Sequence, residues 1–151
     1  MTLNHEFVCI LLKNTNTMVF IHKGTYPMKT QQSDAAYLPA LPAHIQPQIA
    51  QIIRSFANDT KQLLHENIRA EYLFGSYATN RQTPQSDIDI LIIVNHFTHD
   101  LQRQVSGLAA DYSLKYDLYI SPIVQDISAW EKNQYYHTLF YRDIIQQGIQ
   151  L

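Results

Sequence analysis

The stretch that decides the fold is DIDILIIV, residues 87–94, which follows a Gly75-Ser76 pair after ten intervening residues. Beyond its first residues this run is apolar on both faces, which is typical of a central strand covered on both sides. Asp87 and Asp89 stand at positions i and i+2 of the predicted strand, so their carboxylates project to the same face. Two carboxylates a few ångströms apart repel by roughly 4 kcal/mol at an effective dielectric near 20. The pair therefore predicts a bound divalent cation, and a small set of hard oxygen ligands indicates Mg²⁺.

A candidate phosphate-binding segment precedes this strand. Residues 68–74 form a short strand candidate that ends at Gly75. Glycine allows the backbone to approach a phosphate closely, and the start of a following helix would supply N–H donors. Ser76 adds a hydroxyl donor, and Arg81 lies in the polar loop 79–86, from which it could donate to a phosphate as a bidentate ligand.

A third carboxylate is expected from Asp117. In the segment KYDLYI, residues 115–120, the alternation of Tyr116, Leu118 and Ile120 predicts a strand with Asp117 on the opposite face. We expect this strand to end at Ser121-Pro122 and to lie beside the strand that begins at Asp87. Three converging carboxylates can hold two metal ions for in-line displacement at phosphorus.

Helical periodicity surrounds these strands. Apolar residues between Ile45 and Leu64 recur at the spacing of an amphipathic helix. Thr98 is placed to cap a second helix, and a last helix is expected to end at Gly148 in a left-handed C-terminal cap. The alternation of helices and strands predicts an α/β (α+β) fold with a small mixed β-sheet flanked by helices.

The first 42 residues differ from the rest, so we divide the chain into an N-terminal extension, 1–42, and a domain, 43–151. Two apolar runs, 7–12 and 18–21, could pair as a short hairpin. The alternatives are that the extension is poorly ordered, or that translation begins at Met28 and residues 1–27 lie outside the fold.

Composition limits the function further. The 151 residues carry a formal net charge of -2, which argues against broad contact with a nucleic-acid backbone and weakens a polymerase interpretation. The only cysteine is Cys9, so an internal disulfide and a thiolate metal site are both excluded, and a reduced, cytoplasmic protein is expected. The longest apolar run near the N-terminus, 7–12, is too short to span a membrane.

The strings FGSYA, residues 74–78, and SDIDI, residues 86–90, resemble the signature of the DNA polymerase beta-like nucleotidyltransferase superfamily. The resemblance covers roughly residues 68–151 and is strongest to the minimal nucleotidyltransferase branch, the MntA-type antitoxins of HEPN/MNT toxin–antitoxin pairs. This chain departs from that family at Thr79-Asn80, where Arg-Gly is common. Asn tolerates the left-handed backbone of such a turn. The missing arginine is either replaced by Arg81 or leaves nucleotide binding weaker.

The resemblance implies a polymerase beta-like fold and a Mg²⁺-dependent transfer of AMP from ATP to a hydroxyl, a tyrosine of a cognate HEPN toxin. Gly75 and Ser76 would hold the β- and γ-phosphates, Asp87 and Asp89 two Mg²⁺ ions, and Asp117 would complete the catalytic metal site. Two alternatives remain open. One is an antitoxin that neutralises its toxin by binding alone, and the other is an aminoglycoside-type enzyme for small molecules, which the short chain disfavours.

Overall fold

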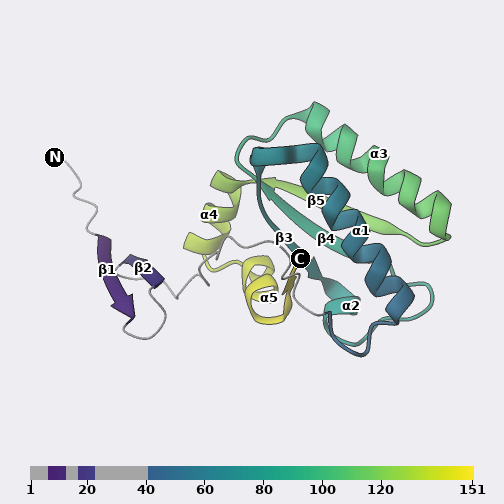
Figure 1. Ribbon diagram of the computed structural model, residues 1–151, viewed down its shortest axis with the longest axis horizontal. Helices are drawn as coiled ribbons and strands as arrows, with labels where there is room; N and C mark the ends of the chain where they lie inside the picture. Colours follow the sequence, from purple (N-terminus) through teal and green to yellow (C-terminus); the bar gives the residue numbers. More distant parts are fainter. Residues whose placement is uncertain (1–6, 13–16, 23–40) are drawn as a thin grey trace. The chain divides into compact units, whose positions relative to one another are not determined.

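The computed structural model describes residues 7–12, 17–22 and 41–151 (Figure 1). The chain divides into two compact units, Met1–Tyr37 and Leu38–Leu151. In the first unit, strands β1 (Phe7–Leu12) and β2 (Thr17–His22) pair in an antiparallel arrangement. The alternative start at Met28 lies outside the described residues.

The second unit is built on a four-stranded mixed sheet in the order β5-β4-β3-β6. The strands are β3 (Ile68–Phe74), β4 (Ile88–Val94), β5 (Ile120–Asp126) and β6 (Ile149–Gln150). Strand β4 runs antiparallel to β3 and parallel to β5, while β6 is antiparallel to β3. The predicted α/β class with a small mixed sheet is confirmed.

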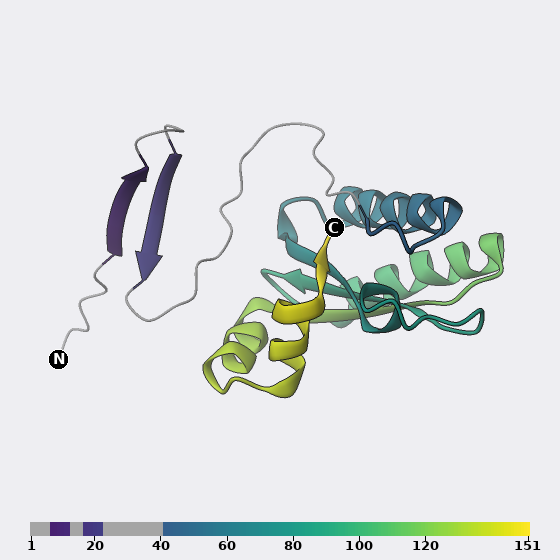
Figure 2. The same ribbon diagram turned by 90° about the horizontal axis from the view of Figure 1, so that it is seen from below.

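Helices α1 (Pro47–Leu64) and α3 (His99–Tyr116) cover one face of this sheet (Figure 2). Alternate residues of β4 point to this face, because successive side chains of a strand point to opposite faces. Ile90 and Ile92 are fully buried there with Phe56 of α1 and Val105 of α3. This is the larger of the two hydrophobic cores, so it anchors β4 from one side.

Helices α4 (Ile127–Tyr135) and α5 (Leu139–Gln147) cover part of the other face. Leu91 and Ile93 of β4 are buried against Trp130 of α4 and Ile144 of α5. Strand β4 is therefore covered on both sides, as its continuous apolar sequence predicts. Asp89 points to the same face as Leu91, one pleat nearer to the start of the strand.

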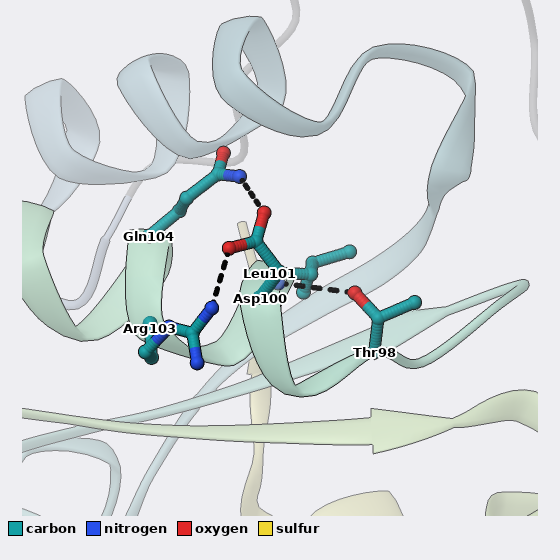
Figure 3. Close-up of polar contacts among 5 residues, drawn as sticks. All are labelled: Thr98, Asp100, Leu101, Arg103 and Gln104. Carbon is teal, nitrogen blue, oxygen red and sulfur yellow. Dashed lines mark hydrogen bonds and ion pairs between the residues drawn. The ribbon is translucent and has the colours of Figure 1, made fainter.

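The start of α3 is fixed by Thr98, whose Oγ1 accepts a hydrogen bond from Leu101 N at 3.1 Å (Figure 3). In the same turn Asp100 accepts hydrogen bonds from Arg103 at 2.8 Å and from Gln104 at 2.7 Å. An acidic residue in the first turn also complements the helix dipole. The predicted cap at Thr98 is confirmed.

The strand predicted over residues 116–120 is wrong. Helix α3 continues to Tyr116, and Asp117 is its C-cap with a left-handed backbone at φ 52°. Tyr116 lies one turn after Tyr112, and their ring centroids are 5.6 Å apart, so the same apolar residues that alternate as a strand also continue the helical stripe. Strand β5 begins only at Ile120 and passes through Pro122 to Asp126.

Gly148 is also not the predicted left-handed cap. Its φ is -68° and its ψ 146°, an extended backbone that leads directly from α5 into β6. The short strand β6 then pairs with Tyr72 and Leu73 of β3. Within the described residues, the structure has no helix with the length and apolar character that a membrane crossing requires.

Candidate active site

The two predicted carboxylates lie together at the start of β4. Asp87 immediately precedes the strand and is exposed, whereas Asp89 is half-buried in it. Burial raises the pKa of the Asp89 carboxyl, and the negative charge of Asp87 raises it further. Asp87 and Asp89 stand two residues apart at the start of the strand, which is the spacing that directs side chains to one face of a sheet.

Gly75 forms a close contact with this pair. It follows β3, opens the single-turn helix α2 (Gly75–Ala78) and has a left-handed backbone at φ 69°. A Cβ built at this position would collide with Asp89 Oδ2 and would lie 3.2 Å from Asp89 Cγ. The absence of a side chain at Gly75 therefore allows the Asp89 carboxylate to lie close to the backbone of this turn.

The turn after α2 is held by its own hydrogen bonds. The Ser76 carbonyl accepts from Arg81 N at 3.0 Å, and Thr79 Oγ1 donates to the Gly75 carbonyl at 2.8 Å. Asn80 adopts a left-handed backbone at φ 58°, as expected for the residue that replaces the family's glycine. Arg81 Nε donates to Thr79 Oγ1 at 3.0 Å, which positions the guanidinium over the end of α2.

Asp117 does not join this cluster in the way the sequence predicted. The register pairs Asp89 with Ser121 of β5, so a serine stands beside Asp89 where a third carboxylate was expected. Asp117 precedes the first paired residue of β5 by three positions, at the end of α3. Across residues 41–151, the structure contains no group of three or more His, Cys, Asp or Glu side chains that could hold a metal ion. Asp117 is therefore not on the strand that was predicted for it, and its role as a third metal ligand stays a prediction.

A cavity of about 230 Å³ opens next to Gly75. One wall comes from the end of β3 and the turn after it, with Phe74, Gly75, Thr79 and Arg81. The opposite wall is one stripe of α5 that comprises Phe140, Asp143, Ile144 and Gln147. Phe74 and Phe140 meet edge to face with their ring centroids 5.8 Å apart. The cavity thus joins the glycine turn to a helix that the sequence analysis did not connect with the site.

Comparison with known proteins agrees with this geometry. Residues 53–149 match the family model of the nucleotidyltransferase domain. The chain belongs to the nucleotidyltransferase domain family. The match includes the glycine turn, both carboxylates of β4 and the α5 wall, and it confirms the resemblance drawn from residues 74–78 and 86–90. The protein is a nucleotidyltransferase with a polymerase beta-like fold.

Two proteins of Methanocaldococcus jannaschii, each named “Putative protein adenylyltransferase”, are similar to this nucleotidyltransferase. MJ0141 is 38% identical over 78 residues, which cover 51% of this chain and 79% of the relative. MJ0604 is 34% identical over 96 residues, which cover 64% of this chain and 90% of the relative. Both relatives are matched over most of their own length.

Among solved structures, the nucleotidyltransferase is similar to “Crystal structure of the toxin-antitoxin with AMP-PNP”. The TM-score is 0.43 at 21% sequence identity, and the match covers 64% of this chain and 69% of the other.

The sequence pointed to Gly75, Ser76, Arg81, Asp87 and Asp89, and the structure gathers Gly75, Asp87 and Asp89 at adjoining strand ends, with Ser76 and Arg81 in the turn that follows Gly75. The sequence prediction did not include the α5 residues Phe140, Asp143 and Gln147. Their spacing of three and four residues is that of one helical face, but the apolar Phe140 and Ile144 in this stripe are equally typical of core packing. Only the three-dimensional arrangement brings this stripe to the end of β3.

Proposed function

We propose that this nucleotidyltransferase transfers AMP from ATP to a hydroxyl group, a tyrosine of a cognate HEPN toxin, and so acts as a cytoplasmic antitoxin. The observation that carries the proposal is the position of Asp87 and Asp89 beside the open backbone of Gly75. The name shared by the two relatives, protein adenylyltransferase, supports a protein as the acceptor.

The residues at the start of β4 fit Mg²⁺ bound together with a triphosphate. Mg²⁺ is commonly held by one or two carboxylates together with substrate phosphates, so Asp87 and Asp89 suffice as protein ligands. Burial raises the pKa of Asp89 and the charge of Asp87 raises it further, and a cation bound between the two carboxylates would offset both effects. Because Gly75 has no side chain, the Asp89 carboxylate can approach the backbone of the turn in which a phosphate would bind. Two ions require the third carboxylate, Asp117, which lies at the end of α3, three residues before β5.

Each residue of the turn has a role in this reaction. Gly75 and Ser76 hold the β- and γ-phosphates, and the guanidinium of Arg81 donates to them, since its Nε is already oriented by Thr79. Asp87 and Asp89 hold Mg²⁺, which neutralises charge on the phosphates when it is bound. The acceptor oxygen attacks the α-phosphorus, the bond to pyrophosphate breaks, and the hydroxyl proton passes to solvent. Positioning and neutralisation of charge supply most of the rate enhancement.

A protein partner also suits the surface at the corner between α4 and α5. Tyr135, Tyr136 and Leu139 are 78%, 72% and 73% exposed, and the two tyrosine rings meet edge to face at 5.0 Å. Exposed aromatic residues of this kind are enriched in protein interfaces. We call these three residues the aromatic corner and propose that it contacts the toxin.

The proposal is tested by incubating the protein and a purified HEPN toxin with Mg²⁺ and ATP and measuring the intact mass of the toxin. We expect an increase by one or more AMP units, with loss of the increase when EDTA is added or when the acceptor tyrosine is replaced by phenylalanine. A toxin of unchanged mass would contradict the enzymatic proposal.

A second candidate function is neutralisation by binding alone. Ser121 beside Asp89, in place of a carboxylate, is the observation that favours it, because fewer acidic ligands weaken metal binding. This function predicts that the toxin is inhibited with its mass unchanged and that inhibition does not require ATP. The same experiment therefore separates the two functions.

A further inference from the structure

The α5 wall of the cavity beside Gly75 carries polar groups that the reaction described above does not use. Phe140, Asp143 and Gln147 lie at positions i, i+3 and i+7 of α5, so they share one face of the helix. That face looks across the cavity toward Arg81 and Thr79. The wall thus combines an aromatic ring, a carboxylate and an amide.

The two walls of the cavity carry opposite charges that are not paired with each other. Among the described residues, neither Arg81 nor Asp143 takes part in an ion pair. Within residues 41–151 the Arg81 side chain donates only through Nε, to Thr79, which leaves its terminal N–H groups for a ligand. A ligand that fits must therefore present anionic oxygens to the Arg81 wall and hydrogen-bond donors to the Asp143 wall.

A polyphosphate alone does not meet this requirement, because the Asp143 carboxylate would repel it. A nucleoside triphosphate does, since its ribose hydroxyls and base N–H groups are donors at the end remote from the γ-phosphate. Phe74 and Phe140 supply apolar ring surface for the base, and the Gln147 amide can both donate and accept at its edge.

We infer that the α5 stripe Phe140–Asp143–Gln147 is the nucleoside-binding wall of this nucleotidyltransferase. Asp143 accepts hydrogen bonds from the nucleoside, Gln147 contacts the base, and Phe140 packs against its ring. This assignment rests on the proposed use of a nucleoside triphosphate, and it makes α5 the element that determines which nucleotide is bound.

The test compares two ligands by isothermal titration calorimetry in the presence of Mg²⁺: ATP, and inorganic tripolyphosphate, which lacks the nucleoside. Asp143→Ala and Gln147→Ala should each weaken ATP binding by about tenfold, the effect of losing one or two hydrogen bonds. Neither substitution should weaken tripolyphosphate binding. Both residues are exposed, so the variants should keep the melting temperature of the wild type.

Gln146→Ala is the matched control, because Gln146 is the exposed neighbour of Gln147 and does not line the cavity. It should bind both ligands as the wild type does. Unchanged ATP binding in Asp143→Ala and Gln147→Ala would overturn the assignment. So would tighter binding of both ligands to Asp143→Ala, which would mark the wall as a phosphate contact. Because the test measures binding and needs no acceptor, it stands apart from the mass test of AMP transfer.

Discussion

An acidic side chain lies on each face of the sheet, and the two side chains have different environments. Glu71 of β3 points to the face under α1 and is 1% exposed, and neither carboxylate oxygen accepts a hydrogen bond within residues 41–151. Asp89 of β4 points to the face under α4 and α5 but lies beyond their cover, next to Gly75 and an open cavity. Burial raises the pKa of both acids.

The difference lies in what each acid can bind. Lys61 Nζ stands 3.8 Å from the Glu71 carboxylate, too far for a hydrogen bond. Burial raises the pKa of Glu71 to about 8, and the positive charge of Lys61 offsets only part of this effect. Asp89 instead is only half-buried and has an acidic neighbour, so a cation from solvent can neutralise its negative charge. A change at Glu71 should therefore affect stability, whereas a change beside Asp89 should affect binding.

The largest expected effect comes from adding a side chain at Gly75, where the Asp89 carboxylate lies close to the backbone. In Gly75→Ala the new Cβ collides with Asp89 Oδ2, and the left-handed backbone costs roughly 1–2 kcal/mol. We expect nucleotidyl transfer to fall by roughly a hundredfold or more, since small misplacements of reacting groups have effects of this size. Steady-state rates and thermal melts measure the two consequences.

Gly107→Ala is the control for this variant. Gly107 lies inside α3 with no atom within 4 Å of a new Cβ, so the substitution should stabilise the helix by roughly 0.5–1 kcal/mol. Transfer should not change. If Gly75→Ala retained wild-type activity, the close contact of Gly75 with Asp89 would have no catalytic role.

The next prediction concerns Glu71, on the face of the sheet under α1. Its pKa is about 8 in the folded protein and about 4.5 in the unfolded chain, so the native state binds the extra proton between these values. The free energy of unfolding should therefore fall by a few kcal/mol as the pH rises from about 4.5 to about 8, because one extra bound proton costs about 1.4 kcal/mol for each pH unit. Glu71→Gln should remove this decline, so that the variant is more stable than the wild type at about pH 9.

Urea denaturation at about pH 5, 7 and 9, on either side of the folded pKa, measures the decline. Glu66→Gln, an exposed neighbour outside the sheet, serves as the control and should follow the wild type. A wild-type stability that rises over this range would show that Glu71 is ionised and well compensated in the folded state.

A smaller effect is expected at the aromatic corner. The double substitution Tyr135→Ala/Tyr136→Ala should weaken toxin binding by roughly tenfold, because exposed tyrosines are common interface anchors. Leu114→Ala, which removes an 86% exposed apolar side chain from α3, should leave it unchanged. Surface plasmon resonance with immobilised toxin measures the affinities of the two variants. Equal affinities would show that the toxin binds a surface other than the aromatic corner.

The smallest effect should come from Asp117→Asn. Asn tolerates the left-handed backbone at this C-cap, so the fold should be kept. The position of Asp117 at the end of α3, outside the predicted strand, leads us to expect transfer rates within about twofold of the wild type. A loss as large as that of Asp87→Asn would restore Asp117 as a metal ligand.

These residues also explain which parts of the site could be predicted from the sequence. Asp87 and Asp89 could be placed because a strand fixes the direction of residues i and i+2, and the apolar run after them leaves little choice of structure. Asp117 could not, because Tyr112, Tyr116 and Ile120 satisfy both a helical and an alternating pattern, and only packing decides between them. The α5 stripe could not be predicted for a related reason. Asp143 and Gln147 stand among apolar residues of α5 that are equally typical of ordinary core packing.

The central claim is that Asp87 and Asp89 hold Mg²⁺ for a nucleoside triphosphate. Its most direct test is ATP binding by calorimetry, with and without Mg²⁺, in the wild type and in Asp87→Asn/Asp89→Asn. We predict that Mg²⁺ tightens ATP binding to the wild type but not to the double variant. The melting temperature of the double variant without metal should equal or exceed that of the wild type, because two repelling charges are gone. Mg²⁺-dependent ATP binding that survives in the double variant would contradict the claim.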